Sequence, residues 1–268
     1  MKALRVAYQV MHHLPGPIRQ ALRKVLAPRL DSHVWALSSP LEGLRMSGPG
    51  VYATYVQRPH EPEVVATLQR IVQPGWVCLD IGAHYGYFTL LLAQLVGPAG
   101  KVIAFEAIAE NAVILRRNVA LNNLEQRVTV ECYAVSDGST NTVHLALPEA
   151  FSLEWTLMQD KGVKTREAPA IALDEYFRGR AGINLIKMDI EGAEALAIQG
   201  MRRLLEEIRP ILVVELHGDG GARAVQQLWQ LGYHLSDLER QTEYAAPSAA
   251  PLPPEGAFRP QHVLARSE

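Results

Sequence analysis

The stretch CLDIGAHYGYFTLLLA (residues 78–93) combines the end of a buried strand, a glycine turn and the start of a helix. An apolar run ends at Asp80, Gly82 and Gly86 bracket the turn, and Tyr87 begins a hydrophobic helical segment. Because glycine has no Cβ, such a turn lets the backbone approach a ligand closely, and the helix directs its first N–H groups toward that ligand. The stretch therefore indicates a nucleotide-type binding site.

The spacing of this turn argues against a dinucleotide. A dinucleotide-binding turn has the pattern GxGxxG, whereas this chain has DxGxxxG. The carboxylate of Asp80 would lie where a diphosphate belongs, but it suits a ligand with an ammonium or sulfonium group, such as S-adenosylmethionine. Glu106 ends the next apolar run, where an acid can accept hydrogen bonds from both ribose hydroxyls. The alternative is that Glu106 is only an acid at the start of a helix.

Length and composition predict a globular α/β protein. With 268 residues, 48% of them apolar and 20% charged, the chain can bury a complete core. Its net charge of −2 gives no general attraction to nucleic acid. No apolar run approaches the roughly 20 residues of a membrane span, and no signal-type segment is evident at the N-terminus, so we expect a cytoplasmic protein.

Alternating strands and helices predict an open, mostly parallel sheet. The apolar runs WVCLD, VIAFE, VTVECYAV, INLIKMD and ILVVELH read as buried strands, separated by helical segments such as residues 111–121 and 193–208. HVLAR (residues 262–266) is expected to be the last strand and to close an edge of the sheet.

Two segments depart from this alternation. Residues 1–57 are predicted to be a helical and strand extension packed on the core domain, residues 58–268. The extension includes a basic amphipathic helix, for which contact with an anionic membrane surface or an acidic substrate is the alternative to packing. Residues 138–172 read as a hairpin insertion, in which Phe151, Ser152 and Trp155 either form a wall of the substrate site or only cover the core.

Polar side chains follow two further predicted strands. IKMDIEGAE places Lys187 and Asp189 on one strand face, with Glu191 and Glu194 at the turn that follows, and VVELHGDG places Glu215 and His217 on one face likewise. If both strands are central and parallel, these side chains converge where a methyl acceptor would stand. Capping of a helix by the two glutamates and a simple pair between Lys187 and Asp189 are the alternatives.

Methyl transfer to an alcohol needs the acceptor oxygen held about 3 Å from the sulfonium methyl group, water excluded, and a base. His217 or Asp189 could be that base, with Glu215 and Lys187 as further members of the catalytic group. A divalent metal ion held by Asp189, Glu215 and His217 could instead lower the pKa of the acceptor. We predict the base rather than the metal.

The segments GWVCLDIGAHYGYFTLLLA, FEAIAENAVILRRNVALNN, INLIKMDIEGAEALAIQGM and RPILVVELHG, in this order, resemble the FkbM-type S-adenosylmethionine-dependent methyltransferases. The resemblance covers about residues 61–264, and KMDIEGAE is its specific part. It implies a Rossmann-like α/β fold with a seven-stranded, mostly parallel sheet, helices on both faces and an antiparallel last strand. It also implies O-methylation of a hydroxyl group on a sugar, a glycoside or a polyketide-type natural product.

Carried over by position, the resemblance implies cofactor-binding roles for several residues: Glu61, Asp80, Gly82, Ala83, His84, Gly86, Glu106, Ala107, Ala134, Val135, Ser136, Asp189 and Glu191. His84 stands where the family usually has asparagine, and Ala107 where proline is common, but neither change removes a binding group.

The expected partner is a small molecule or a glycan. Nucleic acid is not expected, since base methylases carry motifs such as NPPY where this chain has KMDIEG. An NAD-type oxidoreductase and a non-catalytic nucleotide-binding module are the alternative functions.

Overall fold

The computed structural model describes residues 32–51, 55–56, 59–146, 165–179, 182–245 and 261–267. The basic segment at residues 1–31 and the candidates for a substrate wall, Phe151, Ser152 and Trp155, lie outside these ranges, so the predictions made for them stay predictions. Within the described ranges, no helix combines the length and the apolar character that crossing a bilayer requires.

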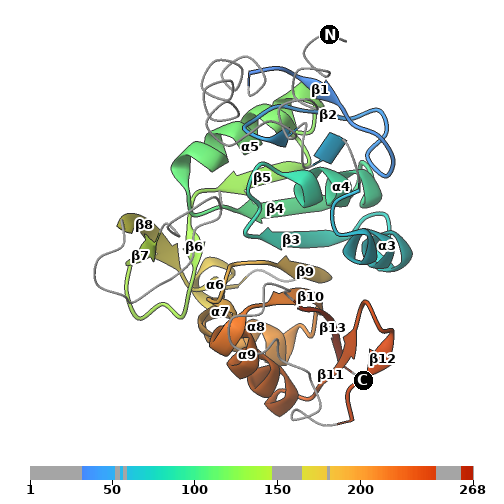
Figure 1. The fold of residues 1–268 in the computed structure, drawn as a ribbon. Helices are drawn as coiled ribbons and strands as arrows, with labels where there is room; N and C mark the ends of the chain where they lie inside the picture. The colour runs from blue at the N-terminus through green and yellow to red at the C-terminus, as the bar shows by residue number, and fades with distance from the viewer. Residues whose placement is uncertain are drawn as a thin grey trace, which may run out of the picture.

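A large sheet forms the centre of the molecule, with the strand order β12-β11-β13-β10-β9-β3-β4-β5 (Figure 1). Its strands are β3 (Val77–Ile81), β4 (Lys101–Phe105), β5 (Val128–Glu131), β9 (Leu185–Met188), β10 (Ile211–Leu216), β11 (Tyr233–Asp237), β12 (Thr242–Glu243) and β13 (Gln261–Ser267). Five neighbouring strands of this sheet are parallel to one another, in the order β5, β4, β3, β9 and β10. β13 is antiparallel to both of its neighbours, β10 and β11. The predicted Rossmann-like sheet is thus confirmed, with the two-residue β12 added at one edge.

Helices cover both faces of this sheet, because its inner strands are apolar on both sides. Cys78 of β3 packs in one core with α3 (Pro62–Ile71), α4 (Tyr87–Leu95) and α5 (Ala109–Leu121). The adjacent Leu79 packs in the other core with α6 (Leu173–Tyr176), α7 (Glu194–Gly200), α8 (Arg202–Glu207) and α9 (Gly218–Gln230). Side chains of one strand alternate between the two cores, as the pleat of a strand requires.

The last strand does not close the sheet edge, contrary to the prediction. β13 lies between β10 and β11, and β12 forms the edge instead. Val263 and Ala265 of β13 are fully buried and Leu264 is nearly so. A strand that is apolar on both faces is stabilised most at an inner position, where both faces are covered.

The predicted strand VTVECYAV is divided in two. After β5, the short β6 (Ala134–Val135) leaves the large sheet and pairs with β8 (Thr165–Ile171), which pairs with β7 (Thr142–Ala146). The antiparallel pair β7 and β8 forms the base of the predicted hairpin insertion, and the residues between them lie outside the described ranges.

The described part of the N-terminal extension contains the short pair β1 (Trp35–Ala36) and β2 (Arg45–Met46). The buried amide of Asn118 joins this segment to the core. It accepts a hydrogen bond from the backbone N–H of Ser47 at 2.8 Å and donates to the backbone carbonyls of Ser47 and Tyr85 at 3.0 and 2.8 Å. The glycine turn is therefore fixed from both the N-terminal segment and α5.

Candidate functional site

The glycine turn after β3 is packed tightly against the end of β9. Gly82 has a φ of +81°, and a Cβ atom there would lie 1.7 Å from the backbone oxygen of Asp189. Gly86, with a φ of +96°, is the N-cap residue before α4, and a Cβ there would lie 2.3 Å from Leu115 Cδ1. Both positions therefore require glycine. The contact at Gly82 also places Asp189 directly beside the turn.

Asp80, at the end of β3, is fully buried. Its Oδ2 accepts a hydrogen bond of 2.5 Å from the Thr89 hydroxyl in α4, whereas its Oδ1 has no hydrogen-bond partner. Burial raises the pKa of Asp80. Thr89 was not predicted from the sequence. A hydroxyl side chain in the first turn of the helix that follows Asp80 could have indicated this hydrogen bond.

Lys187 is a buried cation of the site, lying beside Asp80 in the register of β9 and β3. Its Nζ lies 3.6 Å from Asp189 Oδ2 and 4.6 Å from the centre of the Phe88 ring. Burial alone would lower the pKa of Lys187, but the carboxylates of Asp189 and Asp80 raise it above its usual value. The pair between Lys187 and Asp189, left open by the sequence, is therefore present.

Glu106 lies on the other side of the glycine turn. Its carboxylate accepts hydrogen bonds from the backbone N–H groups of His84 and Ile108, at 2.7 and 2.9 Å, and from the amide of Asn111 at 3.3 Å. Burial raises the pKa of Glu106. Both roles considered for Glu106, binding of the ribose hydroxyls and an acid at the start of a helix, are compatible with this position. The carboxylate supports the start of α5 and also faces the glycine turn.

His84 has an uncharged imidazole. Burial, together with the charges of His60 and Lys187, lowers the pKa of His84 to about 4. Its Nδ1 lies 3.5 Å from the Tyr55 hydroxyl, and its Nε2 has no hydrogen-bond partner. A neutral histidine can donate or accept one hydrogen bond to a ligand at this position.

The other residues predicted to line the cofactor lie around β6 or after Glu106. Ala134 and Val135 form β6, and Ser136 follows it with its backbone N–H bonded to Ile171. Ala107 packs in a small apolar cluster with Ile108. The structure thus places these residues outside the acidic group at the ends of β9 and β10, and their contacts with adenine stay predictions.

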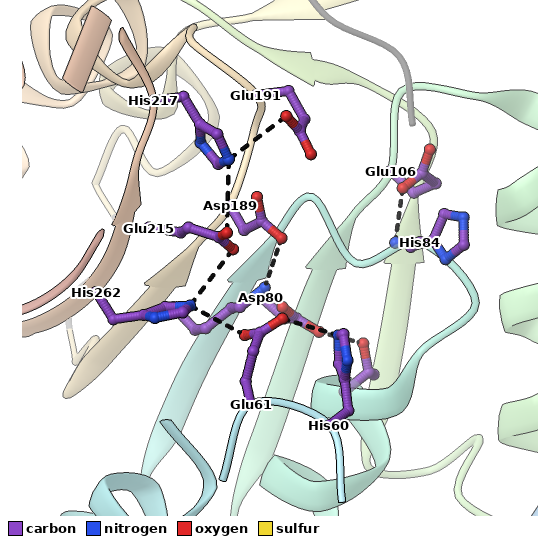
Figure 2. A network of polar contacts seen from close by, with 12 residues as sticks. His60, Glu61, Asp80, His84, Glu106, Asp189, Glu191, Glu215, His217 and His262 are labelled. Atoms are coloured by element: carbon purple, nitrogen blue, oxygen red, sulfur yellow. Dashed lines mark hydrogen bonds and ion pairs between the residues drawn. The ribbon is translucent and has the colours of Figure 1, made fainter. Parts of the chain in front are cut away.

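A continuous acid–histidine network crosses the carboxyl ends of β9 and β10 and the start of α3 (Figure 2). We use this name for His60, Glu61, Glu191, Glu194, Glu215, His217 and His262. His217 Nδ1 lies 3.1 Å from Glu194 Oε1, and His217 Nε2 lies 3.4 Å from Glu191 Oε2 and 3.5 Å from Glu215 Oε1. The predicted convergence of the two strand ends is therefore observed.

The network continues through His262 of β13 to Glu61 and His60 at the start of α3. Glu215 Oε2 lies 3.6 Å from His262 Nε2, which lies 3.4 Å from Glu61 Oε2, and Glu61 Oε1 lies 2.8 Å from His60 Nε2. The sequence reasoning missed His60 and His262. The available signal for His262 was an ionisable residue at the start of the otherwise apolar run HVLAR.

Electrostatics within the network hold two histidines in the charged form. Burial opposes the charge of His217, but the carboxylates of Glu194 and Glu215 raise its pKa to about 11. In the same way, Glu215 and Glu61 raise the pKa of His262 to about 10 against its burial. Burial would raise the pKa of Glu61, but His262 and His60 lower it to about 2.

The predicted metal candidates also meet in space. Asp189, Glu215 and His217 each offer one ligand atom, and these atoms lie within 4.8 Å of one another. Such a spacing is compatible with binding of one divalent ion, and metal binding by this group stays a prediction.

Comparison with known proteins assigns a family to more than half of the chain. The family model described as "Methyltransferase FkbM domain" matches residues 80–235. A protein-L-isoaspartate O-methyltransferase of Aeropyrum pernix is 44% identical over 80 residues, which make up 29% of this chain and 30% of that protein. A catechol O-methyltransferase of Sus scrofa is 32% identical over 75 residues, or 28% of this chain and 40% of that protein. The chain thus matches less than half the length of these relatives.

Two of the solved structures to which the chain is similar are methyltransferases of low sequence identity. An S-adenosylmethionine-dependent O-methyltransferase of Thermotoga maritima has a TM-score of 0.47 and 15% identity, covering 79% of this chain and 66% of that chain. The FkbM methyltransferase of Methylobacillus flagellatus has a TM-score of 0.46 and 16% identity, covering 75% of this chain and 50% of that chain.

Proposed function

The chain belongs to the FkbM family of S-adenosylmethionine-dependent methyltransferases, and we propose that it methylates a hydroxyl oxygen of a sugar, a glycoside or a polyketide-type natural product. The observation that carries this proposal is the position of Asp189, which lies beside the glycine turn and within 4.8 Å of ligand atoms of Glu215 and His217 in the acid–histidine network. Membership of the family decides against the NAD-type oxidoreductase. The absence of a nucleic-acid partner and the cytoplasmic location stay predictions.

The residues around the glycine turn fit the cofactor. Asp80 Oδ1, His84 Nε2 and Asp189 Oδ1 are buried without hydrogen-bond partners among the described residues, so each can bind a polar group of a ligand. When bound, S-adenosylmethionine supplies an electrophilic methyl group on a sulfonium centre. Glu106 would hold the ribose hydroxyls, and the acids on the other side of the turn, Asp80 and Asp189, would balance the positive charge.

Asp189 is the residue best suited to take a proton from the acceptor. Burial raises the pKa of Asp189 well above its usual value, although Lys187 opposes the shift. A carboxylate with a raised pKa is a stronger base near neutral pH. Its Oδ2 faces Lys187, which leaves Oδ1 for the hydroxyl of the acceptor. His217 is less suited, because a protonated imidazole has no lone pair with which to accept a proton.

The charge of the site favours a neutral acceptor over a carboxylate. Asp189, Glu191 and Glu215 lie around the place expected for the acceptor, and like charges at short distance are unfavourable in a partly buried site. The isoaspartate methyltransferases among the relatives are named for a carboxylate-bearing residue. We therefore infer that this chain does not share that acceptor class.

Transfer of a labelled methyl group from S-adenosylmethionine to a panel of glycosides, polyketide alcohols and an isoaspartyl peptide tests the proposal. We expect transfer to a hydroxyl-bearing compound, with and without chelator. Asp189→Asn should lower kcat by about 10²- to 10⁴-fold, the usual contribution of a general base. Glu125→Gln, an exposed change, is the matched control and should keep the wild-type rate.

Three outcomes would contradict the proposal. Transfer to the isoaspartyl peptide alone would identify a carboxyl methyltransferase. A wild-type rate in Asp189→Asn would remove the assigned base. Binding of S-adenosylhomocysteine, measured by calorimetry, without transfer to any acceptor would support a non-catalytic binding module.

A further inference from the structure

Glu61, Glu215 and His262 meet at a point where three separate segments join. Glu61 precedes the first residue of α3, Glu215 lies in β10, and His262 lies in β13. Glu215 and His262 are direct partners in the register of the two antiparallel strands. Figure 2 shows the imidazole of His262 directed between the two carboxylates. This group shares Glu215 with the candidate group of Asp189, Glu215 and His217 but differs in its other two members. His262 faces Oε2 of Glu215, whereas His217 faces Oε1.

The contacts of His262 are too long for hydrogen bonds. Its side chain is only 8% exposed, and neither ring nitrogen has a hydrogen-bond partner; Glu61 Oε2 also lacks one. The Nε2 atom lies 3.4 Å from Glu61 Oε2 and 3.6 Å from Glu215 Oε2. Hydrogen bonds from nitrogen to oxygen usually measure about 2.7–3.2 Å. A buried imidazole is therefore aimed at two carboxylates without bonding closely to either.

These separations match those between ligands of one metal ion. With metal–ligand distances of about 2.0–2.2 Å in tetrahedral geometry, ligand atoms lie roughly 3.4 Å apart. The ligand atoms of Glu61, Glu215 and His262 all lie within 4.8 Å of one another. One imidazole and two carboxylates suit Zn²⁺ or Mn²⁺ better than Ca²⁺ or Mg²⁺, which prefer oxygen ligands alone.

The surrounding charge also favours a cation. Asp80 and Asp189 lie near the same network, and Lys187 is the buried ammonium group between them. The carboxylates of Glu61 and Glu215 each face His262 with one oxygen, and their other oxygens face His60 and His217. A buried carboxylate is costly unless a positive charge accompanies it, and a divalent ion supplies more positive charge than one imidazolium group.

We propose that Glu61, Glu215 and His262 bind one divalent transition-metal ion of the Zn²⁺ or Mn²⁺ class. The ion joins α3, β10 and β13, and it neutralises carboxylates behind the acceptor site. Binding requires the neutral imidazole, so the ion replaces the proton of His262. This inference does not depend on the identity of the methyl acceptor.

Metal binding by the full chain tests the proposal without any activity assay. The protein is treated with chelator, dialysed, and titrated with Zn²⁺, Mn²⁺ and Mg²⁺ in a calorimeter, and bound metal is counted by mass spectrometry. We expect one Zn²⁺ or Mn²⁺ ion per chain and a rise of the thermal midpoint on binding. His262→Gln and Glu61→Gln should each raise the Kd at least about tenfold, since each removes a ligand atom.

Glu125→Gln, an exposed change, is the matched control, and its Kd should stay within about threefold of the wild-type value. His217→Gln tests the alternative ligand group, because His217 contacts the other oxygen of Glu215. Circular dichroism of the metal-free variants checks their fold, and Glu61→Gln carries the test if His262→Gln does not fold.

Several results would overturn the proposal. No binding of either metal to the wild-type chain would show that His262 is a protonated partner of the two carboxylates. An unchanged Kd in Glu61→Gln would exclude this ligand set. A loss of binding in His217→Gln, with binding kept in Glu61→Gln, would place the ion with Asp189 and His217 instead.

Discussion

Replacing Gly82 with alanine should damage both the stability of the fold and the candidate site. A residue other than glycine with a positive φ costs about 1–2 kcal/mol. The added Cβ would also lie 1.7 Å from the backbone oxygen of Asp189, a contact that no rotation of a side chain can relieve. Forcing extra atoms into a packed region typically costs about 1–3 kcal/mol more. We therefore expect Gly82→Ala to lower the free energy of unfolding by about 2–5 kcal/mol.

Gly75 provides a control with nearly the same backbone and no contact. Its φ is +87°, and a Cβ there would have nothing within 4 Å, so Gly75→Ala should cost only the backbone part, about 1–2 kcal/mol. Urea unfolding at 25 °C measures both variants, and calorimetry measures their binding of S-adenosylhomocysteine. Gly82→Ala should lose binding, because the turn and Asp189 must move apart, whereas Gly75→Ala should retain it. Equal losses of stability in the two variants, with binding intact in both, would refute the reasoning.

Three further predictions concern buried polar groups, each measured by urea unfolding. Lys187→Met should lower the free energy of unfolding by about 3–5 kcal/mol, because it leaves the carboxylate of Asp189 buried without its cation. A smaller loss of stability than in Lys101→Met, which changes an exposed lysine, would contradict this prediction. Asn118→Ala should cost about 2–4 kcal/mol, since it removes the partners of the N–H and carbonyl groups of Ser47, and a near-neutral result would show that water replaces them. Burial alone would raise the pKa of Asp237, but hydrogen bonds from Arg240, Tyr244 and Gln261 lower it in the folded chain. The stabilising contribution of the Asp237 carboxylate is therefore present above the unfolded pKa of about 3.9. This contribution is lost as the pH falls through the pKa of Asp237 in the folded chain. The slope of stability against pH below about 4 should therefore be smaller in Asp237→Asn than in the wild-type chain.

Local features of the chain could be predicted because their causes are local. The positive φ angles at Gly82 and Gly86 follow from a tight strand-to-helix turn that only glycine forms without strain. The apolar runs of β3, β4, β9 and β10 predicted a sheet covered on both faces, since each run is too apolar to leave either face in water. The convergence of Asp189 with Glu215 and His217 followed from the parallel order of their strands.

Tertiary structure alone decided the rest. The position of β13 between β10 and β11 depends on pairing between distant segments, and this pairing brings His262 opposite Glu215. Glu61 joins them from the start of α3, although the three residues are far apart along the chain. The charged state of His217 depends likewise on Glu191, Glu194 and Glu215 surrounding one imidazole. Residue type and periodicity determined the elements and the glycine turn, whereas the protonation and pairing of buried groups arise from distances that only the assembled fold defines.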